Sequence, residues 1–393
     1  MIPRIAAKPL QERASYYTAV ALIGPRQSGK TTLVRSLFAS DGGVPAEKAY
    51  VSLENPDVRD YATRDPRGFL ETYATGAIFD EIQYVPSLFS YLQQLIDEDP
   101  RPGKFILTGS NNFLLQEAIS QSLAGRVGYM DLLPMSLSEL GSLAAQDDDA
   151  LMLQGFYPPV YDRNVPADIW YNDYRRTYLE RDVRQIKSIT RFNEFERLLR
   201  LLAGRVAQEL NYSALSVEVG VDVKTVQDWI SVLEQGFILH KLRPYHRNFN
   251  KTIVKRPKIY FTDTGLACAL LGIKEVGQVS SHPLRGSLFE NMVVSDALKH
   301  FTHRGQRPEL YYWRDKTGRE IDLIIEQAGR MLPIEIKAGK TYQSDFARHL
   351  KAFAKLASFD EAWVLYGGKE VYTFSDGLKA FNWREFDQAF TAF

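Results

Sequence analysis

The sequence predicts an α/β fold, a doubly wound parallel sheet, followed by a helical region and a small second α/β part. Strand-like and helix-like segments alternate over residues 1–165, as a parallel sheet with crossover helices requires. A glycine-rich octapeptide separates the first strand from a helix, and the pattern turns helical after residue 166. The expected strands are 18–23, 48–53, 76–80 and 104–109, and the expected domains are 1–165, 166–275 and 276–393.

The octapeptide Gly24–Thr31 has the Gly-x-x-x-x-Gly-Lys-Ser/Thr spacing of a phosphate-binding loop. An apolar strand candidate precedes it and apolar residues at helical spacing follow it, so the loop ends where a helix begins. In such a loop the backbone N–H groups attract phosphate, Lys30 neutralises the β and γ phosphates, and the Thr31 hydroxyl takes a place on Mg²⁺. Glycine is needed where a Cβ would block the phosphate. The alternative is a glycine-rich turn that binds no ligand.

Two acidic residues end the strand expected at 76–80. Asp80 fits the carboxylate that holds Mg²⁺ at the end of a Walker B strand. Glu81 points the other way and is placed to polarise a water for attack on the γ-phosphate. We therefore expect Thr31 and Asp80 to hold the metal ion and Glu81 to be catalytic, with ATP hydrolysis favoured over phosphorylation of a small molecule.

Polar residues also follow the strand expected at 104–109. Ser110 or Asn111 stands where a sensor of the γ-phosphate is expected, and Arg126 would supply charge to the transition state, in cis or to a neighbouring molecule. The alternatives are a polar strand end, a helix cap and an exposed arginine at a helix end. The expected nucleotide-binding residues are Gly24, Gln27, Ser28, Gly29, Lys30, Thr31, Thr32, Ser110 and Arg126.

The composition is that of an ordinary globular protein, with 393 residues, 45% hydrophobic and 24% charged. Because the formal net charge is zero, a nucleic-acid surface would have to be a local patch. The single cysteine, Cys268, excludes an internal disulfide and a multi-cysteine metal site and suits a reducing cytoplasm. The first residues lack the layout of a signal peptide, and no apolar run approaches the length of a membrane span. We expect a cytoplasmic protein without a membrane partner.

The segment after the phosphate-binding domain's last expected strand carries a helix start and a run of acids. Ser136 predicts an N-cap that Glu139 completes as a capping box. The run Asp147-Asp148-Asp149 is expected to be a solvated loop.

Residues 213–219 and 223–235 predict two short helices joined by a Gly220-Val221-Asp222 turn, which is the spacing of a helix-turn-helix. Two strand-like segments, 237–245 and 257–262, then flank a basic link, so the layout is that of a winged helix in contact with DNA. The alternative is a helical adaptor, favoured by acidic residues on the second helix. The link's basic and aromatic residues are Arg243, Tyr245, His246, Arg247, Phe249, Lys251, Lys255, Arg256 and Lys258.

The last third predicts a second site, on a β-hairpin. Period-two alternation puts Glu320 and Asp322 on one face of a strand, and Glu335 and Lys337 on one face of the next. This spacing is that of an Asp…Glu-x-Lys nuclease core, in which two carboxylates hold Mg²⁺ against a scissile phosphate and the lysine orients or deprotonates the attacking water. We expect Asp322, Glu335 and Lys337 to be catalytic, with the two acids as metal ligands and Glu290 nearby. The alternative is a hairpin with a charged, solvated face.

Nearly the whole chain resembles a widespread prokaryotic family of ATP-binding proteins that join an AAA-like P-loop ATPase domain to a C-terminal domain of uncharacterised function. The resemblance implies a winged-helix region joined to a restriction-endonuclease-like fold, in which Asp322, Glu335 and Lys337 match the nuclease motif. Phe156 departs from the family, which usually has glycine there. The segments that carry the resemblance are Gly24–Leu33, Phe79–Gln83, Thr108–Ser110, Ser122–Arg126, Tyr178–Asp182 and Pro257–Leu266.

Together these features predict an ATPase whose nucleotide cycle drives a nucleic-acid-handling module, with a Mg²⁺-dependent DNase as one option. The expected cofactors are ATP and Mg²⁺, and the expected partners are DNA, a protein or a second copy of the chain. The alternative is a nucleotide-gated switch or scaffold that binds a partner protein and cuts nothing.

Overall fold

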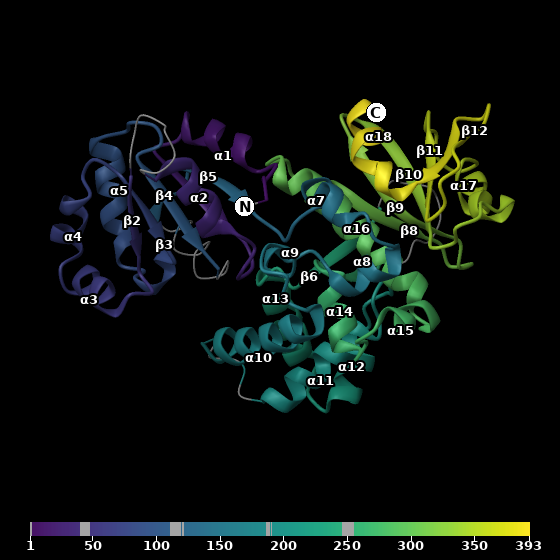
Figure 1. Cartoon of the computed structure of the whole chain (residues 1–393), viewed down its shortest axis with the longest axis horizontal. Coiled ribbons are helices and arrows are strands. Elements are labelled where there is room, and N and C mark those ends of the chain that lie inside the picture. The colour runs from purple at the N-terminus through teal and green to yellow at the C-terminus, as the bar shows by residue number, and fades with distance from the viewer. Residues whose placement is uncertain are drawn as a thin grey trace. The chain divides into compact units, whose positions relative to one another are not determined.

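A computed structural model (Figure 1) describes residues 2–39, 48–110, 119, 122–185, 189, 191–245 and 255–393. The chain forms two compact units. The N-terminal unit extends to Met135 and also takes Gln235–Phe237 and Phe301–Gln306. The C-terminal unit consists of Ser136–Glu234, Ile238–His300 and Arg307–Phe393. This division into two units is coarser than the three domains that the sequence predicts. The three domains therefore stay a prediction.

The N-terminal unit is built on a five-stranded sheet with the order β2-β3-β4-β1-β5, in which all neighbouring strands are parallel. The predicted parallel sheet is therefore confirmed. The first four strands lie within the expected ranges, whereas β5 was not expected, because Gly128 near its start weakens the strand pattern. The strands are β1 (Ala19–Ile23), β2 (Ala49–Ser52), β3 (Ala77–Asp80), β4 (Phe105–Gly109) and β5 (Val127–Asp131).

The central strands β1, β3 and β4 are buried on both faces, which explains why they are nearly continuous apolar runs. Successive side chains alternate between the faces. Ile78 therefore joins a core with two helices, while its neighbour Phe79 packs at a tilt against Phe69 of a third helix, with the ring centroids 5.8 Å apart. The helices of this unit are α1 (Ala7–Ala14), α2 (Lys30–Phe38), α3 (Pro56–Arg64), α4 (Pro66–Thr72) and α5 (Leu88–Glu98).

The C-terminal unit carries a mixed eight-stranded sheet with the order β12-β13-β11-β10-β9-β8-β6-β7. The central strands β8, β9 and β10 pair antiparallel, while β10 and β11 pair parallel. The hairpin β6–β7 joins this sheet because β6 pairs with β8. The strands are β6 (Leu239–Pro244), β7 (Lys258–Phe261), β8 (Leu310–Arg314), β9 (Glu320–Gln327), β10 (Arg330–Lys337), β11 (Ala362–Tyr366), β12 (Tyr372–Thr373) and β13 (Leu378–Asn382).

Helices of the C-terminal unit form where the sequence has helical spacing and caps. The second helix of the expected helix-turn-helix, α13, covers Val223–Gln235, and Gly220 ends α12 with a φ of 84°. The helices are α7 (Leu137–Leu140), α8 (Asp148–Gln154), α9 (Pro158–Asp162), α10 (Ala167–Gln185), α11 (Phe192–Ala203), α12 (Tyr212–Val219), α13, α14 (Thr264–Leu270), α15 (Val276–Ser281), α16 (Arg285–His303), α17 (Arg348–Phe353) and α18 (Phe386–Ala392).

The three aspartates at 147–149 are not a solvated loop, so that expectation is wrong. Asp147 is the N-cap of α8, and the next two carboxylates are buried. Asp148 pairs with Arg384 at 2.7 Å and Asp149 with Arg285 at 2.8 Å. The sequence pattern could not reveal this, because both arginines lie more than a hundred residues further along the chain. The capping box of Ser136 and Glu139 forms as expected.

Candidate nucleotide site and acid cluster

The loop Gly24–Thr31 connects β1 to α2 at the carboxyl edge of the parallel sheet. Gly29 adopts a φ of 95°, and a Cβ on Gly24 would come within 2.1 Å of a backbone oxygen, so both positions require glycine. Lys30 is buried and donates hydrogen bonds to the carbonyl oxygens of Gly24 and Pro25 at 2.9 and 2.8 Å. The lysine thus reaches back over its own loop.

The other residues expected to bind nucleotide differ in burial and backbone conformation. Ser28 is completely buried, and its hydroxyl has no hydrogen-bond partner among the described residues. Gln27 has a positive φ of 60°, and Thr32 is exposed in the first turn of α2. An unsatisfied buried hydroxyl beside a helix N-terminus fits an anionic ligand that would accept its hydrogen bond.

Asp80, at the end of β3, faces the start of α2. The Thr31 hydroxyl donates to its two carboxylate oxygens at 3.2 and 3.1 Å. Tyr50 donates to the same carboxylate at 2.6 Å, and Thr108 donates to it from the neighbouring strand β4. A hydroxyl and a carboxylate oxygen at one point offer the ligands that Mg²⁺ takes in P-loop sites.

Glu81 follows directly in a left-handed backbone conformation, with a φ of 56° that is uncommon outside glycine. Its carboxylate accepts a hydrogen bond of 2.8 Å from the Ser110 hydroxyl and another from the Gln83 amide. Burial would raise the pKa of this carboxyl, but the charge of Lys30 and these hydrogen bonds outweigh it and hold the pKa below its usual value. Glu81 is therefore ionised at neutral pH and held in one place.

Ser110 is thus engaged with Glu81, whereas Asn111 lies outside the described residues. The Arg126 guanidinium is paired with Asp97 of α5, through contacts of 2.6 and 2.9 Å. This side chain is about a third exposed. Among the described residues, it bonds to Asp97 and to the Ala124 carbonyl, both outside the phosphate-binding loop, so the structure does not bring it to the rest of the nucleotide site.

In the C-terminal unit, the hairpin of β9 and β10 brings three of the expected residues together. Ile334 pairs with Leu323, so the next residues, Glu335 and Asp322, stand opposite each other. Lys337 Nζ lies 3.3 Å from Asp322 and 2.5 Å from Glu335. Both carboxylates are buried, and the charged hairpin face is not a solvated one.

Charge and burial act in opposite directions on these two acids. Burial, together with the charge of Asp322, raises the pKa of Glu335 to about 7. Burial also opposes ionisation of Asp322, but Lys337 and Lys258 outweigh it and lower the pKa of this carboxyl. The closely spaced acids therefore share their negative charge unequally, as expected for two carboxylates in one site.

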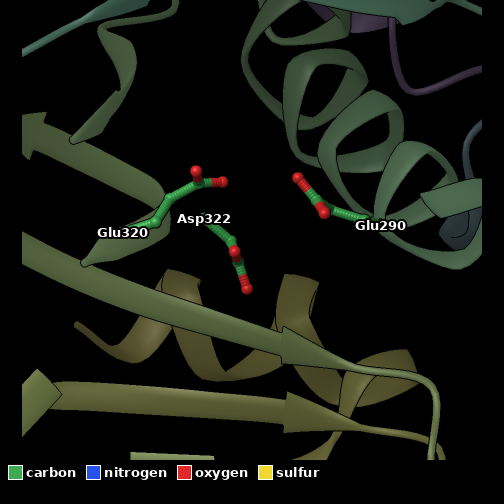
Figure 2. A group of neighbouring side chains, drawn as sticks. All are labelled: Glu290, Glu320 and Asp322. Carbon is green, nitrogen blue, oxygen red and sulfur yellow. The ribbon is translucent and has the colours of Figure 1, made fainter. Parts of the chain in front are cut away.

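A second group of carboxylates adjoins the first. Oxygens of Glu290 on α16 and of Glu320 and Asp322 on β9 lie within 4.8 Å of one another, and Figure 2 shows the three side chains converging from the helix and the strand. The ammonium of Lys258 on β7 contacts both Glu290 and Glu320 at 2.6 Å. Tyr260 also donates to Glu290, at 2.6 Å. We call Glu290, Glu320, Asp322 and Glu335 the acid cluster.

Comparison with known proteins places the chain in a family. Residues 16–141 match the family model of an AAA domain, and two domains of unknown function, DUF8612 and DUF4143, match residues 146–276 and 285–386. The uncharacterized protein Rv2008c of Mycobacterium tuberculosis is 30% identical over 379 residues, which cover 96% of this chain and 82% of that protein. The chain belongs to the family of this mycobacterial protein. The Mycobacterium bovis member, Mb2031c, matches to the same extent.

The family thus has an AAA-type P-loop domain in its N-terminal part, as the sequence predicts. Among solved structures, the chain resembles the Walker-type ATPase PABY2304 of Pyrococcus abyssi with a TM-score of 0.46 and 16% identity, over 67% of this chain and 94% of that one. Within the described part of this family member, no helix has the length and apolar character to cross a membrane.

Several residues of the two sites were not predicted. Tyr50, Thr108 and Gln83 contact the acids at the end of β3, although none of them was assigned a role from the sequence. Thr108 and Gln83 lie in segments that carry the family resemblance, whereas Tyr50 belongs to no motif. Lys258 was expected in a DNA-binding link, and this is wrong, because its side chain is 3% exposed and paired with two glutamates. The sequence signal for Lys258 was its place in a short segment that carries the family resemblance. No sequence pattern pointed to His349 on α17, whose Nδ1 lies 3.5 Å from Glu335.

Proposed function

We propose that the N-terminal unit binds ATP with Mg²⁺ and hydrolyses it. The observation that carries this proposal is the pairing of Thr31 with Asp80 beside an ionised Glu81 that Ser110 and Gln83 hold in place. The buried hydroxyl of Ser28 and the glycines of the loop support a phosphate ligand. The family's AAA domain covers the same residues.

In this mechanism Lys30 turns from the carbonyls of Gly24 and Pro25 to the β and γ phosphates, while Thr31 and Asp80 hold the metal ion. Bound Mg²⁺ offsets the negative charge of the phosphate oxygens. Glu81 orients a water and accepts its proton as the water oxygen bonds to the γ-phosphorus and the bond to the bridging oxygen breaks. The products are ADP and phosphate.

The test is ATP turnover by the full chain with Glu81→Gln and Lys30→Ala. Glu81→Gln should retain ATP binding and lower turnover about a hundredfold or more, the scale of a general base. Lys30→Ala should abolish binding. Glu71→Gln on α4, an exposed position, is the matched control and should behave as wild type. Equal turnover in wild type and Glu81→Gln would show that Glu81 is not the general base.

For the C-terminal unit we propose a nucleic-acid-handling role and, as its sharpest form, Mg²⁺-dependent cleavage of DNA. The contact of Lys337 with both Asp322 and Glu335 supports this form. Among the described residues, the hydrogen bonds to Asp322 fall on Oδ2, and Glu335 Oε1 is buried, accepts no well-formed hydrogen bond and lies 3.5 Å from His349 Nδ1. Asp322 Oδ1 and Glu335 Oε1 are thus the oxygens that would bind a cation, with Glu335 exchanging its His349 contact for the ion, so these residues fit a magnesium ion.

In this reading Asp322 and Glu335 would hold the ion, which would offset negative charge on the scissile phosphate, and Lys337 would orient the attacking water. The water oxygen would bond to phosphorus and release its proton to solvent while the bond to one ester oxygen breaks, and that oxygen would take a proton from solvent. The nucleotide cycle of the N-terminal unit would control this step. We also propose that the protein acts in the cytoplasm.

Lys337→Ala separates this proposal from its rival, a nucleotide-gated switch or scaffold with an inactive nuclease-like part. Purified protein is incubated with single-stranded, duplex and branched DNA, with Mg²⁺ or Mn²⁺ and with or without ATP. A nuclease should lose cleavage in Lys337→Ala and in Asp322→Ala, and Lys351→Ala on the exposed side of α17 should retain it. Equal cleavage by wild type and all three variants would come from a contaminating nuclease. The scaffold interpretation would then hold.

A further inference from the structure

Lys258 and Tyr260 belong to the family segment Pro257–Leu266, for which the proposed ATPase and nuclease chemistry has no role. Both residues lie on β7, which is far in sequence from the nuclease-like hairpin, and both contact Glu290. Lys258 also contacts Glu320, so its ammonium lies between a helix and a strand that carry two acids of the cluster. The position between these acids, where Figure 2 shows them converging, is one that a metal ion would otherwise fill.

The charges of the acid cluster set how many divalent ions it can hold. The four carboxylates face three cationic side chains, the ammonium groups of Lys258 and Lys337 and the guanidinium of Arg314, which lies 3.1 Å from Glu320. When all seven groups are ionised, one negative charge remains uncompensated, and His349, 3.5 Å from Glu335, offsets it when protonated. One divalent cation therefore already more than neutralises the cluster, and a second would add two further positive charges to a buried site, which is strongly unfavourable.

The two lysines differ in how readily they can yield to a metal ion. Lys337 is 31% exposed, at the end of β10, and its contact with Asp322 is long, at 3.3 Å. Lys258 is 3% exposed, and its two contacts are both 2.6 Å. A cation arriving from solvent therefore displaces the Lys337 ammonium from Asp322 and Glu335. It cannot displace Lys258 without moving a buried side chain away from two buried partners.

We infer that Lys258 occupies the position of a second cation, so that the acid cluster binds one divalent metal ion, at Asp322 and Glu335, beside a fixed ammonium group. This inference rests on the metal site of the proposed nuclease function. A fixed positive charge at this place would stabilise negative charge on the reacting phosphate in the manner of a second ion, without a second metal-binding step. The metal dependence of any cleavage would then follow a single binding event.

The test counts the Mn²⁺ ions bound by the full chain without nucleotide, from the free Mn²⁺ signal in electron paramagnetic resonance. Wild type should bind one ion that Asp322→Asn abolishes. Lys258→Met, which keeps the length of the side chain and removes its charge, should bind one more ion than wild type. Lys274→Met is the matched control, because it removes an exposed lysine outside the acid cluster, and it should bind as wild type does.

Glu320→Gln keeps the inference testable if Lys258→Met does not fold. Glu320 contacts Lys258 and is not a ligand in the inferred site, so Glu320→Gln should bind Mn²⁺ within about threefold of wild type. Loss of the ion in this variant would place the metal between Glu290, Glu320 and Asp322 and overturn the inference.

The remaining outcomes separate the inference from the function on which it rests. Two ions in wild type, or no additional ion in a folded Lys258→Met, overturn the inference and leave the nuclease proposal standing. No ion in wild type but one in Lys258→Met supports the role of Lys258 and removes the metal site of the proposed nuclease. No ion in either protein overturns both.

Discussion

Single side chains decide how the two acids after β3 differ in role. Asp80 is surrounded by hydroxyl donors from three elements, whereas Glu81 is held by Ser110 and Gln83. The order of the two acids was visible in the sequence. The partners of each acid were not, because Tyr50 and Thr108 reach Asp80 from strands that become neighbours only when the sheet forms.

Ser110 tests this difference. The sequence suggested a sensor of the γ-phosphate, but its hydroxyl donates to Glu81 at 2.8 Å and helps to lower the pKa of that carboxyl. Ser110→Ala should therefore raise the pKa of Glu81 and move the acid limb of the kcat profile to higher pH. A lost hydrogen bond to a charged group predicts a fall in kcat of about tenfold, with ATP affinity unchanged.

The control for this measurement is Ser36→Ala, which removes a hydroxyl that donates to the Leu33 carbonyl within α2. Its pH profile should match that of wild type. An acid limb that stays in place in Ser110→Ala, with weaker ATP binding instead, would return Ser110 to the role of phosphate sensor.

At the scale of elements, the sequence predicted those whose signal is local. The ends of α13 follow from an apolar period and a glycine, and the four expected strands of the N-terminal sheet follow from apolar runs bounded by turns. The hairpin of β9 and β10 follows from alternation around a turn. The same alternation predicted that Asp322 and Glu335 share one face of the hairpin. Position in the sheet was not predictable, because β6 pairs with β8 across a long separation in the chain.

The buried ion pairs were hidden for the same reason. Asp148 and Lys258 carry no sign in the sequence that their partners are charged residues elsewhere in the fold. Charged residues are exposed more often than not, so a pattern argument assigns them to solvent. The acid cluster shows where this default fails, since a compensating charge from another element makes burial possible.

Some basic residues of the predicted DNA-binding link lie among the described residues, beside the β6–β7 hairpin. Arg243 and Lys255 are exposed and line an open hollow of about 560 Å³ with Tyr212 and Tyr311. Cationic groups beside aromatic rings suit the phosphates and bases of nucleic acid. Of the other link residues, His246, Arg247, Phe249 and Lys251 lie outside the described residues.

If this hollow contacts DNA, alanine at both Arg243 and Lys255 should weaken binding at every sequence tested. The dependence of log K on log salt should lose about 0.9 of slope for each phosphate contact removed. A salt titration by fluorescence anisotropy measures both effects. Alanine at both Lys351 and Lys355, two exposed lysines in and after α17, is the control of equal charge. Unchanged affinity and slope in the double variant would favour the helical adaptor.

At the scale of the whole molecule, one chain joins a nucleotide site and an acid cluster that lie in different compact units. Motifs predicted both sites, because each depends on a short local pattern. Communication between them has no local pattern, since it is a property of the equilibrium between conformations of the chain. It is measured as a coupling free energy between two ligands, and thermodynamics requires that energy to be the same from either side.

Because of this reciprocity, coupling between the nucleotide site and the DNA-binding part can be tested from either ligand. If the nucleotide cycle controls the nucleic-acid-handling part, saturating ATP should change the dissociation constant for DNA by a factor of about 5 to 150, the usual range of allosteric coupling. Saturating DNA must then change the dissociation constant for ATP by the same factor. Both are measured with Glu81→Gln, which should hold ATP without consuming it, and Lys30→Ala should give a factor of one for DNA. A factor of one in both directions for Glu81→Gln would mean that the two sites work independently, whereas unequal factors would show that a further equilibrium, such as self-association, contributes to one of the measurements.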